Sequence, residues 1–382
     1  MSELSYLEKL LDGVKVEWKT LDKVLKRTKG TKITAGQMKA LHKDNAPLKI
    51  FAGGKTVAFV DFKDIPEKDI NREPSIIVKS RGIIEFEYYD KPFSHKNEMW
   101  SYHSNNDAIS IKYIYYFLKI NEGYFQKIGG KMQMPQIATP DTDKFEVPIP
   151  CPDNPEKSLA IQSEIVRILD KFTALTAELT AELNMRKKQY NYYRDQLLNL
   201  EGRENTREMR IGDIYDFQYG TGNTIPKSGG QYPVYGSNGI VGSHDKYNSE
   251  DSPVIGHIGA YAGIVNWGQG KHFVTYNGVI CRHKSKEVLQ KYAYYLLLLQ
   301  DFGSKSNSAS QPFVSYNILN APIVLVPPLQ EQARIVAILD KFDTLTNSIT
   351  EGLPREIELR QKQYEYYRDL LFSFPKPETV SN

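Results

Sequence analysis

Two segments of the chain, residues 156–202 and 330–374, carry hydrophobic residues at the i, i+3, i+4, i+7 spacing that is typical of an amphipathic helix. The second segment repeats the first, because Ile165–Thr176 matches Ile335–Thr346 in most of its apolar and polar positions. An apolar stripe that recurs in two distant segments predicts two long antiparallel helices packed on each other, as in a coiled coil. Two ordinary core helices are the simpler alternative, and the pattern leaves it open.

The second helix is predicted to be interrupted. After the first match, which has an offset of 170 residues, the repeat resumes with Lys188–Asp195 against Lys362–Asp369 at an offset of 174 residues. The four extra residues lie near Gly352, a helix stop signal, and Pro354, which suits a first helical turn. We therefore expect the helix to end and restart at this point.

The blocks that precede the two helices show strand-like alternation, many glycines and turn dipeptides, and little helix. They are diverged copies of each other. Each has a glycine turn, at Phe51–Thr56 or Val234–Gly239, and an aromatic helix, at Tyr113–Leu118 or Tyr292–Leu299. A common frame with different loops is how one fold presents two binding surfaces. Two surfaces suit a bipartite target such as DNA, whose grooves offer separated short sites along a rod.

These patterns predict a mixed α+β chain, with two globular α/β domains in a pseudo-two-fold arrangement joined by two long antiparallel helices. The start of the chain resembles the tail of the first helix, so the chain ends are expected to lie close together. The predicted boundaries are 1–155 for the first domain, with a helix tail at 1–13, 156–202 for the first helix, 203–329 for the second domain, 330–374 for the second helix and 375–382 for a C-terminal tail.

Charge and composition narrow the class of protein. The 382 residues carry 49 Lys and Arg against 46 Asp and Glu, so no large polycationic surface is expected, although a basic face balanced elsewhere would still bind DNA. The longest apolar stretch, Tyr292–Leu299, is too short to cross a bilayer, and the acidic N-terminal sequence is unlike a signal peptide. A cytoplasmic protein without membrane contact is expected.

No catalytic residue and no metal site is predicted. Gly53–Thr56 looks like the end of a phosphate-binding loop, but that motif needs a glycine where Lys49 stands. The histidines are scattered, and no carboxylate pair or Ser/His/Asp set has a suitable spacing. Cys151 and Cys281 are expected to be structural thiols, because no metal-binding spacing surrounds them.

Four sequence motifs are distinctive: Tyr232–Gly239, Gln311–Ser315, Pro327–Val336 and the Tyr-Tyr-Arg-Asp endings of both helices. They resemble motifs of the specificity subunit of type I restriction-modification systems, and the resemblance covers essentially the whole chain. The first block departs from this pattern, since it has Ala-Gly-Gly-Lys-Thr where the second has Tyr-Gly-Ser-Asn-Gly. The roles of single loop residues therefore do not transfer between the blocks.

The resemblance implies a function in DNA restriction and modification. Each block would be a target recognition domain that reads one half of a split, asymmetric site in double-stranded DNA. The helices would set the half-site spacing and dock two modification subunits, which hold S-adenosylmethionine and methylate adenine N6. Restriction subunits that use ATP and Mg would join them to cleave DNA, as a defence against phages. The chain itself is expected to catalyse nothing and to hold no cofactor, since it lacks the Asn/Asp-Pro-Pro-Tyr/Phe tetrapeptide that such methyltransferases use on a flipped adenine.

Two alternatives from other classes stay open. One is a single-chain DNA methyltransferase or nuclease, which turnover of DNA by the purified chain with cofactor would favour. The other is a protein-only adaptor that has lost DNA reading. Salt-sensitive binding that one bipartite site competes for would separate a DNA reader from such an adaptor.

A tandem repeat within the first helix suggests how a spacing would be set. Thr176–Leu179 is followed at once by the identical Thr180–Leu183. Four residues add about 6 Å of helix, which corresponds to roughly 1–2 base pairs of DNA. We expect this helix to act as a ruler. The alternative is that Thr-Ala-Glu-Leu is simply a good helix-forming unit.

Candidate contact residues are of two kinds. In the polar loops, Lys would hold phosphates, while Asn, Ser, Thr and Tyr would meet base edges. The DNA candidates are Lys43, Lys49, Lys55, Thr56, Lys96 and Asn97 in the first block, and Asn223, Lys227, Tyr235, Ser237, Asn238, Lys246 and Tyr247 in the second. On the helices, where aromatic and Arg side chains are typical interface anchors, the partner candidates are Tyr190, Tyr193, Arg194, Tyr364, Tyr367 and Arg368. Turn, solvated or helix-packing roles are the alternatives for each.

Overall fold

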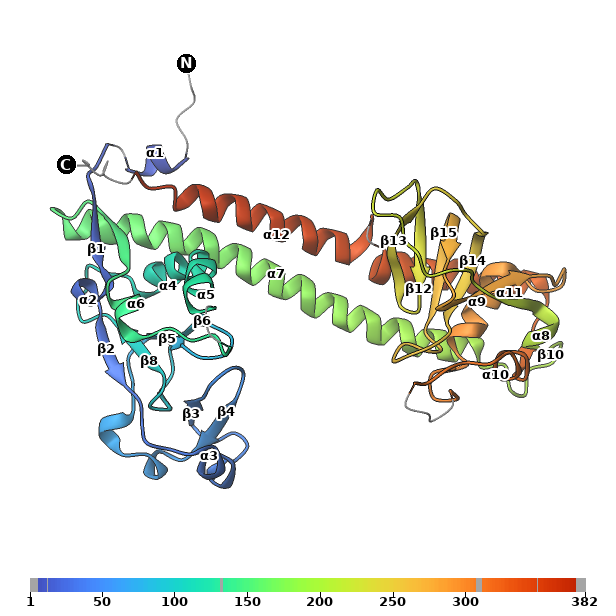
Figure 1. Cartoon of the computed structure of the whole chain (residues 1–382), viewed down its shortest axis with the longest axis horizontal. Helices are drawn as coiled ribbons and strands as arrows, with labels where there is room; N and C mark the ends of the chain where they lie inside the picture. The colour runs from blue at the N-terminus through green and yellow to red at the C-terminus, as the bar shows by residue number, and fades with distance from the viewer. Residues whose placement is uncertain (1–5, 12, 131–132, 307–310, 349, 376–382) are drawn as a thin grey trace, which may run out of the picture. The chain divides into compact units, whose positions relative to one another are not determined.

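The computed structural model describes residues 6–11, 13–130, 133–306, 311–348 and 350–375 (Figure 1). The chain divides into two compact units, Met1–Glu178 with Ile357–Asn382, and Leu179–Glu356. The unit boundaries fall inside helix α7 (Pro155–Leu198) and inside helix α12 (Gly352–Leu371). Each unit therefore contains one globular part, the N-terminal part of one long helix, which we call its head, and the C-terminal part of another, which we call its tail. Among the described helices, none has the length and apolar character of a membrane span.

The globular part of the first unit is built from small sheets and short helices. The strands are β1 (Val16–Thr20), β2 (Lys26–Lys29), β3 (Leu48–Phe51), β4 (Val57–Val60), β5 (Ser75–Lys79), β6 (Glu85–Tyr89), β7 (Phe93–His95), β8 (Trp100–His103) and β9 (Glu146–Pro150). The helices are α1 (Tyr6–Leu11), α2 (Leu21–Val24), α3 (Ala35–Leu41), α4 (Ile111–Ile120), α5 (Glu122–Gly129) and α6 (Thr139–Asp143), with 3-10 helices η1 (Phe62–Asp64) and η2 (Glu67–Asp69). The sheet orders are β2-β8-β5-β6, β4-β3-β7 and β1-β9.

Helix α4 forms the core of this part because one of its faces is entirely apolar or aromatic. Its first turn is capped by Ser110, whose hydroxyl accepts the backbone N–H of Tyr113. Tyr113 and Phe117 are buried in one cluster with Val78 and Phe86 of the four-stranded sheet. Burying each such side chain contributes about 1.5–3 kcal/mol. A separate small cluster, centred on Ile50, holds β3 and β4 under α3.

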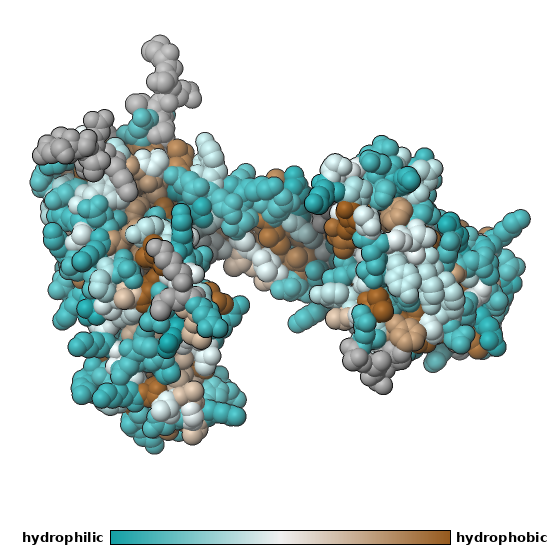
Figure 2. All heavy atoms as spheres, in the orientation of Figure 1, coloured by the Kyte–Doolittle hydropathy of each residue, from teal (hydrophilic) through white to brown (hydrophobic). Residues whose placement is uncertain are grey.

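The second unit has a larger sheet. Its strands are β10 (Arg207–Arg210), β11 (Tyr215–Tyr219), β12 (Tyr232–Gly236), β13 (Gly239–His244), β14 (Ser249–Gly256), β15 (Val265–Val274), β16 (Gly278–His283) and β17 (Ile323–Val326). Its helices are α8 (Ile211–Ile214), α9 (Gln290–Leu298), α10 (Tyr316–Asn320) and α11 (Leu329–Asn347). The six-stranded sheet has the order β11-β16-β14-β15-β12-β13, and β10 pairs with β17. Figure 2 shows hydrophilic residues over most of the visible surface, as expected where apolar side chains are buried inside each unit.

The two units repeat one topology, which confirms that the two blocks are diverged copies. The antiparallel pair β1–β9 corresponds to β10–β17. The parallel pair β3–β7 corresponds to β12–β15, with Phe51 opposite His95 in one and Tyr235 opposite Val274 in the other. In each case the long helix follows the last strand, since α7 comes after β9 and α11 after β17.

The predicted interruption of the second helix is confirmed. Helix α11 ends at Asn347, and α12 begins at Gly352. Gly352 has a φ of 79°, and a Cβ there would lie 2.4 Å from the carbonyl oxygen of Thr344, so only glycine fits without a shift of the backbone. Helix α7 runs without a break for 44 residues, a length of about 66 Å. It ends at Leu198, earlier than the predicted boundary.

A buried glutamine fixes the head of a long helix to the globular part in both units. Gln332 accepts the backbone N–H of Leu289 at 2.7 Å and donates to the carbonyl oxygens of Glu287 at 2.9 Å and Pro327 at 2.8 Å. Gln162, 170 residues earlier, accepts the backbone N–H of Ser110 at 2.9 Å. Both glutamines have no exposed surface. Each therefore provides hydrogen-bond partners for backbone groups in the partly buried contact between helix and globular part.

A tyrosine adds a second repeated tie between globular part and helix. The hydroxyl of Tyr116 in α4 donates to Asp170 of α7 at 2.5 Å. The hydroxyl of Tyr295 in α9 donates to Asp340 of α11 at the same distance. Burial and the neighbouring carboxylate raise the pKa of both phenols, so they remain donors at any physiological pH.

The tail of the other helix packs on this head through stacked rings. In the first unit, Phe172 of α7 stacks on Tyr367 of α12, with centroids 5.5 Å apart. In the second unit, Phe342 of α11 stacks on Tyr193 of α7 at 5.6 Å. Head and tail are therefore joined by the same contact in both units, and within the first unit α7 and α12 run antiparallel (Figure 1).

The glutamine tie makes a prediction for stability. Replacing Gln332 by Leu keeps the volume but leaves the N–H of Leu289 and the carbonyl of Glu287 without a partner. We expect the free energy of unfolding to fall by about 2–4 kcal/mol, as measured by urea denaturation followed by circular dichroism. Gln361→Leu, at an exposed position of α12, is the matched control and should change stability by at most ~0.5 kcal/mol. Equal losses in the two variants would contradict this role of Gln332.

Candidate nucleic-acid interface

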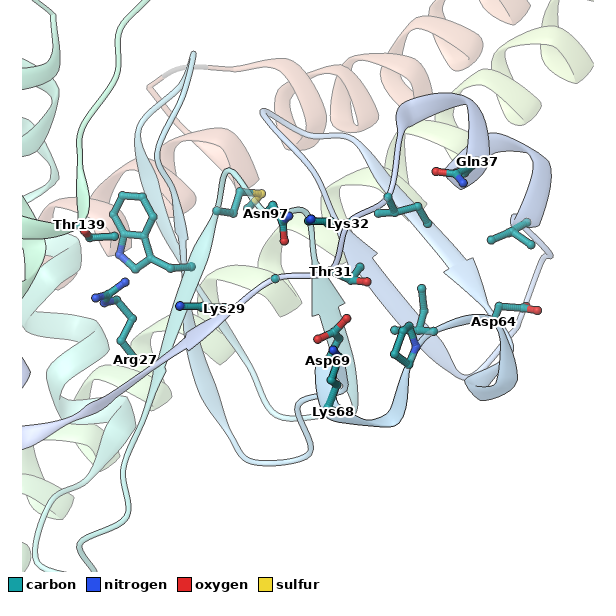
Figure 3. Close-up of a pocket in the computed structure, with 17 residues that line it drawn as sticks. Arg27, Lys29, Thr31, Lys32, Gln37, Asp64, Lys68, Asp69, Asn97 and Thr139 are labelled. Atoms are coloured by element: carbon teal, nitrogen blue, oxygen red, sulfur yellow. The ribbon is translucent and has the colours of Figure 1, made fainter.

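A cavity of about 760 Å³ opens in the first unit beside strand β2 (Figure 3). Its walls come from β2 and the turn that follows it, from α3, from the segment of η1 and η2, from the loop before β8 and from the first residue of α6. The polar side chains in this lining are those of Arg27, Lys29, Thr31, Lys32, Gln37, Asp64, Lys68, Asp69, Asn97 and Thr139. The cavity thus gathers residues that are up to 112 positions apart in the sequence, from Arg27 to Thr139.

The lining of this cavity carries more positive than negative charge, with four cations against two carboxylates. Arg27 is tied to Asp143, at 3.2 Å from its Nε. Lys29, Lys32 and Lys68 are exposed and form no ion pair with any described residue. An exposed ammonium without a carboxylate partner is available to hold a phosphate.

A buried histidine supports the floor of the cavity. Nε2 of His95 lies 3.1 Å from the hydroxyl of Ser101, and Nδ1 lies 3.1 Å from the carbonyl oxygen of Lys96. Burial lowers the pKa of His95, so the ring is neutral at physiological pH. Its carbonyl oxygen accepts the backbone N–H of Thr31 at 2.8 Å, and a Cβ on Gly30 would lie only 2.3 Å from that oxygen. Glycine is therefore required where the chain passes from β2 into the cavity wall.

The second unit repeats this backbone frame. Gly220 follows β11 as Gly30 follows β2, and a Cβ on Gly220 would lie 2.2 Å from the carbonyl oxygen of Thr275. The next residue, Thr221, donates its backbone N–H to the carbonyl of Val274 at 3.1 Å. Further along, the bridge Ile258–Phe313 corresponds to Arg81–Gln136, and the hydrogen bond from Val314 to His257 corresponds to that from Ile137 to Ser80. The two surfaces can therefore be compared position by position.

The side chains on this common frame are different. Where the first unit has Lys29, Asn97 and Thr139, the second unit has tyrosines: Tyr219, Tyr276 and Tyr316. The first surface is thus cationic and polar, and the second is aromatic. A constant backbone with exchanged side chains is the arrangement expected of two surfaces that bind different short targets.

In the first unit, the predicted contact residues are spread over several places. Asn97 lines the cavity. Lys55 and Thr56 are exposed at the turn between β3 and β4. The other three are paired with carboxylates: Lys43 with Asp61 at the surface, Lys49 with Glu87 at 3.4 Å and over the ring of Phe51, and Lys96 with Glu98 at 2.5 Å. These three ammonium groups would have to leave a carboxylate before they could bind a phosphate.

In the second unit, the predicted residues divide into exposed and structural ones. Asn223, Lys227, Asn238, Lys246 and Tyr247 are exposed on loops and turns around β12 and β13. Tyr235 and Ser237 do not fit the prediction of DNA contact, because both hold the fold. Tyr235 is 7% exposed and donates its hydroxyl to the carbonyl of Trp267 at 3.2 Å. The hydroxyl of Ser237 lies 3.0 Å from the carbonyl oxygens of both Ile258 and Asn277.

Sequence reasoning missed most of the cavity and the whole aromatic surface. The cationic residues were detectable, since Lys26–Lys32 contains four basic residues in seven positions, which is a local excess. Lys68, Tyr276 and Tyr316 gave no such signal, because only the fold brings them to β2 or β11, and Tyr219 within β11 gave none because a single tyrosine in a strand is common.

The helices carry the predicted partner residues in two equivalent sets. Tyr193 and Tyr367 are 44% and 42% exposed, whereas Tyr190 is buried against Phe342. Arg194 lies over the ring of Tyr190 and beside Asp195, and Arg368 lies over the ring of Tyr364 and beside Asp369. The most exposed rings of both sets, Tyr192 at 61% and Tyr366 at 65%, were not predicted.

The described part of the chain shows neither a metal-binding group nor a reactive thiol. Nowhere among these residues do three His, Cys, Asp or Glu side chains form a group that could hold a metal ion. Cys151 and Cys281 are both free thiols, and burial raises the pKa of Cys281 well above its ordinary value. Buried thiols of this kind are unreactive.

Comparison with known proteins agrees with the repeated frame. A family described as the type I restriction modification DNA specificity domain matches residues 15–186 and 203–359. The chain is 41% identical to the type I restriction enzyme EcoR124I/EcoR124II specificity subunit of Escherichia coli, over 100% of both chains. It is 37% identical to the EcoprrI specificity subunit of the same species, over 92% of this chain and 93% of that protein.

Among solved structures, the S subunit of a type I restriction-modification system from M. genitalium has the same fold. The TM-score is 0.66 at 18% sequence identity, over 96% of this chain and 98% of that one. Each of the two matched family regions covers one globular part and part of the long helix or helices that follow it. The chain therefore belongs to the type I restriction-modification DNA specificity family and carries two copies of its specificity domain.

Proposed function

We propose that this chain is the non-catalytic sequence reader of a type I restriction-modification complex, and that each unit contacts one half of a bipartite site in double-stranded DNA. The observation that carries the proposal is the repeated frame around Gly30 and Gly220, on which the two units present different side chains. Two equivalent surfaces with different chemistry suit two different half-site sequences. S-adenosylmethionine, ATP and Mg belong, on this proposal, to the partner subunits.

The lysines of the cationic cavity in the first unit bind phosphates of the DNA backbone. Lys29 and Lys32 lie on one wall and Lys68 on another, and all three are exposed. Neutralising phosphates with Lys releases condensed counterions, so affinity falls as salt rises. The chain as a whole has a net charge of only +3, so its partners are expected to add much of the non-specific affinity.

The double variant Lys29→Ala/Lys32→Ala tests this phosphate contact. In complex with modification subunits, we expect affinity for the cognate duplex to fall about tenfold near 0.15 M salt, and the slope of log K against log salt to decrease by about 2. Fluorescence anisotropy at several salt concentrations measures both quantities. Lys127→Ala, an exposed lysine of α5 outside the cavity, is the control and should leave them unchanged. An unchanged slope in the double variant would remove the cavity from the DNA interface.

The two Tyr-Tyr-Arg-Asp faces are proposed to dock two modification subunits, one on each unit. They are equivalent in their stacked ring, their Arg–Asp pair and their exposed outer tyrosine. An exposed tyrosine next to an arginine is a typical interface anchor. Two equivalent faces suit two copies of one partner.

This docking model predicts stepwise assembly. Tyr192→Ala or Tyr366→Ala alone should give complexes with one modification subunit, and the double variant should weaken both contacts at least tenfold, since a hot-spot ring contributes about 2 kcal/mol. Native mass spectrometry counts the bound subunits. Tyr261→Ala, at a 50% exposed ring outside the helices, is the control. Full occupancy in the double variant would place the docking surface elsewhere.

Helix α7 is proposed to set the half-site spacing. It is continuous through both copies of Thr-Ala-Glu-Leu, so added residues would extend it rather than form a loop. Inserting a third copy after Leu183 should lengthen the preferred spacer by ~1–2 base pairs and leave both half-site sequences unchanged. A methylation map of the host genome reads this out. Thr180→Ala, which keeps the helix length, should keep the spacer, and an unchanged spacer after insertion would refute the ruler.

A further inference from the structure

The aromatic surface of the second unit is an ordered stack of rings. Tyr219 lies between His257 and Tyr316, with centroid distances of 4.1 and 4.2 Å and interplanar angles of 27° and 15°. The backbone N–H of Tyr219 donates to the hydroxyl of Tyr316 at 3.0 Å, which fixes the two rings relative to each other. Tyr276 closes one side, with its ring nearly perpendicular to that of His257 at 5.3 Å.

The stack leads from the interior of the unit to solvent. His257 is only 5% exposed, and its Nδ1 lies 3.1 Å from the carbonyl oxygen of Tyr276. At the outer end, Tyr316 and Phe313 are each 37% exposed and Tyr276 is 48% exposed. Burying a ring normally stabilises a fold, so several rings that stay exposed at one place mark a binding surface.

The charges around the stack favour a nucleic acid over a protein as its partner. The stack is carried by the segments 219–231, 257–264, 274–278 and 311–321, which contain no Asp or Glu and one basic residue, Lys227. The helix faces, by contrast, keep a carboxylate beside each half-buried arginine, as at Asp195 and Asp369. A surface of rings, amides and hydroxyls without carboxylates can approach DNA without repelling its phosphates.

The stack lies at the place in the second unit that corresponds to the cationic cavity of the first unit. Tyr219, Tyr276 and Tyr316 occupy the positions that Lys29, Asn97 and Thr139 occupy in the first unit. If that frame faces DNA in one unit, the same frame faces it in the other, because the two domains have the same topology.

Building on the proposed function, we propose that Tyr276 and Tyr316, supported by Tyr219, form a nucleobase-contact platform in the second unit. Charge anchors the first half-site, and ring contact with a nucleobase reads the second. In a duplex the faces of the bases are stacked on one another, so an aromatic ring meets a base at its edge in a groove, for example at a thymine methyl, and this contact is lost when the ring is replaced by alanine. It neutralises no phosphate, so it leaves the salt dependence of binding unchanged.

The test uses the full chain in complex with its modification subunits and a duplex that contains the mapped bipartite site. Tyr276→Ala/Tyr316→Ala should weaken binding at least tenfold with the salt slope unchanged. Discrimination against a duplex altered in the second half-site should fall, while discrimination against one altered in the first half-site stays. Lys127→Ala, at an exposed lysine of α5 outside both surfaces, should bind like the parent chain. The lysine pair Lys29→Ala/Lys32→Ala is the matched comparison, since it should change the salt slope instead.

Two results would overturn the platform. One is a double tyrosine variant that binds and discriminates like the parent, with its thermal midpoint unchanged. The other is a loss of affinity accompanied by a lower salt slope, which would assign an electrostatic role to this surface. Failure of the proposed function looks different, because the parent complex itself would then show no preference for any bipartite duplex.

Discussion

In each unit a fully buried glutamine holds the head of a long helix against the globular part, and the rest of the architecture depends on this tie. Gln162 and Gln332 pair backbone groups of the segment before α4 or α9, and a Tyr–Asp hydrogen bond follows two turns further along the helix. Isolated polar helices are marginal in water, so packing of this kind is what keeps such helices folded. The same hydrogen bonds fix the position of each globular surface relative to its own helix. A protein that binds DNA with the globular surface and partner subunits with the helix requires this fixed position.

The two binding surfaces show how one backbone supports two chemistries. The close approach at Gly30 and Gly220 cannot change without moving the strands, because an added Cβ would meet a carbonyl oxygen at little more than 2 Å. The side chains one residue earlier differ between the units: Lys29 is exposed, whereas Tyr219 stacks between His257 and Tyr316. The backbone position that is the same in both units and the side chain that differs between them are thus neighbours in the sequence.

The large-scale organisation could be predicted from the sequence, because it rests on local signals. The helix stripes, the break at Gly352 and the paired blocks all follow from periodicity and stop residues. Matching the two glycine turns in the sequence makes Phe51 equivalent to Val234. The parallel strand pairs of the structure make Phe51 equivalent to Tyr235 instead, a shift of one residue that no turn motif reveals. The contact residues were harder to predict from the sequence than the fold. Tyr235, Ser237 and Tyr190 have polar groups that suit an interface. Tertiary packing, however, buries Tyr235 and Tyr190, and the hydroxyl of Ser237 forms hydrogen bonds within the fold.

We propose that one chain with two specificity domains selects a DNA site in two parts. Sequencing of methylated adenines in the DNA of a host that carries this chain with its modification partner tests the claim most directly. We expect a new asymmetric motif of two short specified segments separated by unspecified bases of fixed number. A single uninterrupted motif, or no change in methylation relative to a host without the chain, would contradict it.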